Sequence, residues 1–168
     1  MPSTAPLTDL PPAIGVHLIA ALLAIGLGPV AIYRRRRDLW HKSVGYIWVM
    51  SMTLTAISAF WIAADVLPLV AAFGPIHLLS VWVLYQLARA LSEARGGHIA
   101  RHSVRMHGLY WTGLMGAGLL TLLPGRTLNR AIFPQMPELA YGVIAGGMVL
   151  WVLVIWRQRR VCRSTRNT

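Results

Sequence analysis

Apolar residues fall into five long runs, which short polar or basic segments separate. Each run has roughly the 17 to 25 residues that a helix needs to cross the hydrocarbon core of a bilayer, and none has a charged residue near its middle. We therefore expect an all-α integral membrane bundle, with a four-helix core and one additional helix. The predicted spans are residues 12–33, 43–64, 74–91, 106–123 and 139–156, with loops on one side at 65–73 and 124–137.

The composition agrees with a membrane protein. Hydrophobic residues make up 56% of the 168-residue chain, charged residues only 12%, and the mean hydropathy is +0.56, whereas a soluble domain carries about 25% charged residues. We expect a single membrane domain over residues 1–168 that ends in a basic tail at 157–168. The net charge of +11 does not indicate a nucleic-acid partner, because the basic residues form short clusters between apolar runs, where they orient membrane proteins and contact acidic lipids.

The basic residues also predict an orientation. By the positive-inside rule, the N-terminus lies outside and the C-terminus, with the single cysteine Cys162, lies in the cytoplasm of a multi-pass inner (plasma) membrane protein. Met1–Pro12 lacks the Lys and Arg of a signal peptide, so the first run should remain as a spanning helix. Only Arg126 and Arg130 lie on the outer side. The other fourteen basic residues are Arg34, Arg35, Arg36, Arg37, Lys42, Arg89, Arg95, Arg101, Arg105, Arg157, Arg159, Arg160, Arg163 and Arg166.

Four histidines follow a repeated spacing. His17 precedes His41 by 24 positions, and His77 precedes His102 by 25. A helix of about 24 residues rises roughly 36 Å, which is close to the thickness of a bilayer with its headgroups. We therefore expect His17 and His77 to form an outer pair near one membrane face, and His41 and His102 to form an inner pair near the other.

Two facing imidazoles at matched depth are typical of axial ligands to haem b. The pattern thus predicts two cofactor-binding bis-histidine sites, in which the four histidines would be the iron ligands. Zinc would need three or four ligands. The outer pair is deeper and drier, so we expect it to be the better haem site, while His107 is a rival to His102 as inner ligand and His98 should simply be exposed. The alternative is that each ring only hydrogen-bonds a backbone carbonyl or water.

Other residue patterns favour structural roles. Small residues at four-residue spacing, such as Ala20, Ala24 and Gly28, are typical of close helix packing, although they would also leave room for a flat macrocycle. Hydroxyl side chains on the second run, such as Ser58, more often bond to their own helix backbone. The sequence contains no nucleophile–base–acid set and no hydrolase, Walker or dinucleotide motif, so it leaves open whether the protein is an enzyme.

The chain resembles a family of bacterial predicted membrane proteins, the one catalogued as domain of unknown function 2306. The resemblance covers about His17 to Arg126. It implies an integral membrane protein of four or five helices, with histidines at the positions of His17, His41, His77 and His102, and it implies no established reaction. The stretches that carry it are HLIAALLAIGLGPV, RRRRDLWHKSVGYIWV, SAFWI, FGPIHLLS, RHSVRMHGLY and TLLPGR.

In layout the chain is also similar to di-haem proteins of the cytochrome b561 type, in which alternate helix pairs supply ligands near opposite faces. This chain departs from them because its inner histidines lie at predicted helix starts. The leading hypothesis is a small transmembrane electron carrier with two haem b groups, reduced by a quinol or a soluble donor. The alternatives are an accessory or assembly protein of a larger respiratory complex, and a proton or metal carrier that uses the same histidines.

Overall fold

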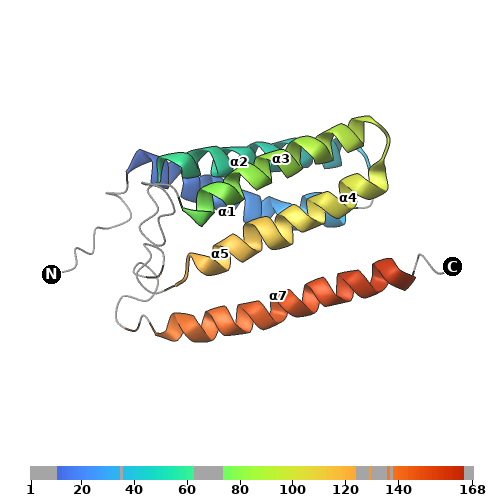
Figure 1. Ribbon diagram of the computed structural model, residues 1–168. Helices are drawn as coiled ribbons and strands as arrows, with labels where there is room; N and C mark the ends of the chain where they lie inside the picture. The colour runs from blue at the N-terminus through green and yellow to red at the C-terminus, as the bar shows by residue number, and fades with distance from the viewer. Residues whose placement is uncertain are drawn as a thin grey trace. The chain divides into compact units, whose positions relative to one another are not determined.

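The computed structural model describes residues 11–34, 36–62, 74–123, 129, 136 and 138–164, and throughout these residues the regular structure is helical (Figure 1). The all-α prediction is therefore confirmed for the described part of the chain. The predicted loops at 65–73 and 124–137 lie outside it, apart from residues 129 and 136. The elements are α1 (Pro12–Tyr33), α2 (Leu39–Ser58), the 3₁₀ segment η2 (Ala59–Trp61), α3 (Pro75–Arg95), α4 (Ile99–Gly108), the π-helical segment η3 (Leu109–Met115), α5 (Gly116–Leu120) and α7 (Leu139–Ser164).

Several helices extend beyond the predicted spans into polar sequence. Helix α2 begins at Leu39 rather than residue 43, because the Asp38 side chain accepts a hydrogen bond from the His41 backbone N–H and caps the helix. The predicted basic turn before the fourth span shrinks to Gly96–His98, where Gly97 has a positive φ of 77°. Helix α4 therefore starts at Ile99 rather than at residue 106.

The chain divides into two compact units. Residues 9–114 form one unit, which contains α1 to α4 and η3 up to Leu114, and residues 1–8 with 115–168 form the other. In the larger unit, α1 packs against α2, α2 against α3, and α3 against α4. In the smaller unit α5 contacts α7, where Leu119 lies against Gly147.

Small residues allow the elements of the larger unit to approach α1 closely. Ala20, Ala24 and Gly28 are all buried on one stripe of α1. The Trp48 indole N–H donates to the Ala24 carbonyl at 3.0 Å, and the Tyr110 ring occupies the space that a Cβ on Gly28 would need. The packing interpretation of these residues is confirmed, because aromatic side chains fill the space beside Gly28.

A buried ion pair joins α3 to α4. The Arg105 Nε donates to both carboxylate oxygens of Glu93, at 2.9 and 3.0 Å, and its Nη1 donates to Gln86 Oε1 at 2.6 Å. The Glu93 side chain is only 7% exposed. Because a buried carboxylate is costly unless it is paired and hydrogen-bonded, this contact fixes how the two helices meet.

The described helices differ in their capacity to cross a membrane. Helix α1 and the run Leu39–Trp61 are long and apolar enough to span, and the apolar part of α7, Leu139–Leu153, is shorter. Large apolar side chains such as Ile19 and Met50 are more than 60% exposed, which suits a surface that faces hydrocarbon rather than water.

Replacing Gly28 with Ala should destabilise the larger unit. The new Cβ would lie 2.2 Å from Tyr110 Cε2, so the Tyr110 ring must move, and we expect a loss of about 1–3 kcal/mol, as for other overpacked sites. The measurement is the thermal unfolding midpoint in detergent. The matched control is Gly26→Ala on the same helix, where a Cβ meets nothing within 4 Å; equal effects of the two changes would contradict the packing argument.

Replacing Glu93 with Gln should also destabilise this unit, because it leaves the Arg105 guanidinium without its buried counter-charge. Because the Arg105 side chain is 29% exposed and keeps some water, we expect a loss of about 1–3 kcal/mol, which is the cost of an unsatisfied polar group. In a double-mutant cycle, Arg105→Gln should lower the free energy of unfolding much less in the Glu93→Gln background than in the wild type. Additive losses would mean that the two side chains do not depend on each other.

Candidate functional site

His41 and His102 lie in the first turns of α2 and α4. Helix α2 begins at Leu39 and helix α4 at Ile99, so each histidine follows closely after a helix start. Both side chains are partly buried. The structure places both residues inside helices, because both helices begin earlier than expected. The facing arrangement of the inner pair stays a prediction.

The hydrogen bond of His102 leaves a ring nitrogen with a lone pair. Its Nδ1 lies 2.9 Å from the Ala90 carbonyl oxygen. Since a carbonyl oxygen can only accept, Nδ1 carries the proton, and Nε2 of the neutral ring is then unprotonated. Metal-ligating histidines are usually held in this way, with the second nitrogen donating to a carbonyl or carboxylate. His102 is therefore oriented and protonated as a ligand would be.

His41 is held through its backbone. Its N–H binds the Asp38 carboxylate at 2.9 Å, and Arg34 donates to both oxygens of the same carboxylate. The Arg34 hydrogen bond, followed by that of the His41 N–H, lowers the pKa of Asp38 to about 2. This cap is therefore fully present above pH 4 and weakens as the pH falls toward 2.

The His41 ring itself carries an unsatisfied nitrogen. In the described part of the chain, its buried Nδ1 has no hydrogen-bond partner. A buried polar atom without a partner costs about 1–3 kcal/mol. A ligand or a water at this nitrogen would therefore be stabilising, which makes the inner end a candidate binding site.

The outer histidines lie beside the end of α2. The His17 Nδ1 is 3.1 Å from the Ser58 hydroxyl, and the His77 ring lies 5.9 Å from the Phe60 ring, measured between centroids. The Ser58 hydroxyl also bonds the Thr55 carbonyl of its own helix, as predicted. The facing arrangement of His17 and His77 stays a prediction, although the same short segment contacts both.

The tautomer of the neutral His77 ring differs from that of His102. Its Nδ1 accepts a hydrogen bond from the Gly74 backbone N–H at 3.0 Å and so caps α3. The proton of the neutral ring must then lie on Nε2, which is a donor and not a ligand. The hydrogen bonds therefore give His77 and His102 different tautomers, and which of the two pairs is the better haem site stays a prediction.

The two remaining histidines have separate surroundings. The His107 Nδ1 lies 2.8 Å from the Ser103 carbonyl oxygen, and its ring meets Tyr33 edge-on with centroids 5.5 Å apart. His98 is exposed, as predicted. The choice of His102 over His107 as the inner partner stays a prediction.

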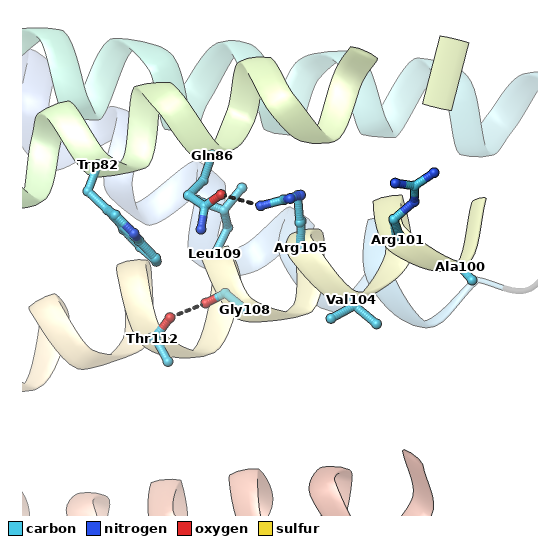
Figure 2. Close-up of a pocket in the computed structure, with 9 residues that line it drawn as sticks. All are labelled: Trp82, Gln86, Ala100, Arg101, Val104, Arg105, Gly108, Leu109 and Thr112. Atoms are coloured by element: carbon cyan, nitrogen blue, oxygen red, sulfur yellow. Dashed lines mark hydrogen bonds between the residues drawn. The ribbon is translucent and has the colours of Figure 1, made fainter. Parts of the chain in front are cut away.

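Sequence reasoning missed the polar cluster between α3 and α4. Gln86, Glu93 and Arg105 are joined by hydrogen bonds, and Arg105 and Gln86 line a pocket of about 480 Å³ (Figure 2). The available signal was the Gly96–Gly97 turn, since a tight turn folds an acid before it onto a base after it. The hydropathy pattern gave no sign of the pocket.

The comparisons with known proteins agree with the membrane interpretation. Residues 14–156 match the family model described as predicted membrane protein (DUF2306). No curated protein and no solved structure matches the chain. The matched segment includes all four histidines of the predicted pairs and most of the chain, and the protein therefore belongs to the DUF2306 family of predicted membrane proteins.

Proposed function

We propose that this protein is a small electron carrier of the inner membrane that holds haem b between His41 and His102. The single observation that carries the proposal is the hydrogen bond that fixes His102 Nδ1 to the Ala90 carbonyl and leaves Nε2 available as a ligand. Two imidazoles from different helices of a bundle are sufficient to bind a haem iron on its two axial faces. Such a haem, when bound, would accept and release one electron at a time.

The inner residues suit this ligand set. His102 offers Nε2 while Nδ1 is fixed to the Ala90 carbonyl, and His41 has a buried nitrogen that gains from a partner. Among the described residues there is no group of three or more His, Cys, Asp or Glu side chains that could hold a metal ion.

His17 and His77 are proposed as a second bis-histidine site near the outer face. For His77 to become a ligand, its Nδ1 must release the Gly74 N–H and take up a proton instead. We therefore expect the outer site to bind haem less tightly than the inner one. A quinol or a respiratory complex is the proposed source of electrons.

The proposal includes five spans, with the N-terminus outside and the C-terminus inside. Helix α1 and Leu39–Trp61 supply two apolar crossings, and α7 begins with a third apolar stretch. Helix α7 continues as far as Ser164, so the basic tail begins as helix, which suits Arg and Gln as good helix formers. The positive-inside rule supports a cytoplasmic tail.

The orientation can be tested at Cys162. In intact cells this thiol should resist a membrane-impermeant maleimide, and it should react after lysis. No second cysteine interferes, because Cys162 is the only one in the chain. Labelling of intact cells to the same extent as of lysed cells would reverse the proposed orientation.

The cofactor can be tested by the visible spectrum of the detergent-solubilised protein. When it is produced with ample haem, the wild-type protein should show a Soret band and a dithionite-induced change. His41→Ala and His102→Ala should each remove the inner haem, whereas the control His107→Ala should retain it. His17→Ala and His77→Ala should affect only a second haem.

A wild-type protein without a Soret band would contradict the electron-carrier proposal. If that protein also co-purified with a larger complex, the accessory function would be the better explanation. If His107→Ala lost haem and His102→Ala retained it, the electron-carrier proposal would stand, with His107 rather than His102 as the inner ligand.

A further inference from the structure

The pocket between α3 and the α4–η3 segment has a polar end and an apolar end. Arg101, Arg105, Gly108 and Thr112 recur every three or four residues, so they share one face of α4 and η3. From residue 101 to residue 112 this face rises about 16 Å. Trp82 lines the same pocket from α3, opposite Thr112 (Figure 2). The guanidinium groups of Arg101 and Arg105 therefore lie toward the start of α4. The Trp82 ring lies at the other end of the pocket, beside η3.

The two arginines of the pocket differ in charge balance. Arg105 is neutralised by Glu93 and also bonded to Gln86, as Figure 2 shows for the second contact. Arg101 is exposed, and no ion pair holds it within the described residues. The pocket therefore presents one uncompensated positive charge at its polar end.

The rest of the pocket suits an apolar chain. The apolar side chains of Val104, Leu109 and Trp82 line it beyond the arginines, and a Cβ added to Gly108 would meet nothing within 4 Å. The volume of about 480 Å³ lies within the usual range for small-molecule sites. An occupant with a single negative charge at one end and hydrocarbon at the other matches this division.

We propose that this pocket binds an acidic phospholipid, with the phosphate against Arg101 and one acyl chain along Gly108 toward Trp82. Charge complementarity selects an anionic headgroup, because Arg101 supplies the only charge that is not already balanced among the pocket residues. Membership of a membrane-protein family places such lipids within reach. A trapped lipid would contact both α3 and the α4–η3 segment, because residues of both line the pocket. The proposal is independent of haem.

Native mass spectrometry of the full-length protein provides the test, with phosphatidylglycerol and phosphatidylcholine offered at equal concentration. The wild-type protein should retain one phosphatidylglycerol in preference to phosphatidylcholine. Arg101→Gln should weaken this binding about tenfold, as expected for the loss of one charge-assisted contact. Gly108→Leu should abolish it by filling the pocket while leaving the backbone unstrained.

Two matched controls separate the pocket from general effects. Arg89→Gln removes an exposed charge from α3 outside the pocket, and Gly45→Leu adds the same side chain at another open helical glycine. Both should bind phosphatidylglycerol as the wild type does. Thermal midpoints measured without added lipid show whether each variant is folded.

Three results would overturn the proposal. They are equal retention of the two lipids by the wild type, wild-type binding by Gly108→Leu, and equal losses in Arg101→Gln and Arg89→Gln. Glycerol phosphate provides the last comparison: if this soluble anion competes at the same concentration as the lipid, the site recognises a free phosphate and not a lipid. Any Soret band should be unchanged in Gly108→Leu, which keeps this test separate from that of the electron carrier.

Discussion

The arrangement of residues 9–114 depends on the close approach of two aromatic side chains to the small-residue stripe of α1. Trp48 from α2 and Tyr110 from η3 both pack where Gly28 has no side chain, and Trp48 also bonds the Ala24 carbonyl. His41 precedes Trp48 by seven positions, and His102 precedes Tyr110 by eight. Each histidine therefore lies about two helical turns, or roughly 11 Å, from an aromatic residue fixed at the same level of α1. This shared contact supports a matched depth for the inner pair, which stays a prediction.

Hydropathy predicted the existence of the helices better than their ends. A hydropathy pattern reports where a helix is apolar, whereas the helix continues until its backbone is capped or turned. Asp38 starts α2 four residues before the predicted span, and the Gly96–His98 turn lets α4 begin well before residue 106. The hydropathy pattern could not predict the Glu93–Arg105 ion pair for a related reason. Its members lie outside the apolar runs, and only the fold of the turn brings them into contact.

The spacing of the histidines predicts which rings belong to the same end, and this pairing stays a prediction. The spacing could not predict which nitrogen of each ring is available. That property depends on single backbone groups, namely the Ala90 carbonyl beside His102 and the Gly74 N–H beside His77. A carbonyl leaves the distal nitrogen as an acceptor, and an N–H leaves it as a donor. Depth and dryness, which the sequence does suggest, favour the outer pair, whereas the hydrogen bonds give His77 and His102 different tautomers.

Adjacent positions on α4 serve different contacts because the helix turns by about 100° per residue. His102 faces the Ala90 carbonyl of α3, while Arg101 and Arg105 line the pocket. Glu93 separates the roles of the two arginines, since its carboxylate holds Arg105 between the helices and leaves Arg101 as the open charge. One buried acid thus determines both how α3 meets α4 and where the pocket is positive. The total charge of the chain could not have revealed this, because it counts the two arginines alike.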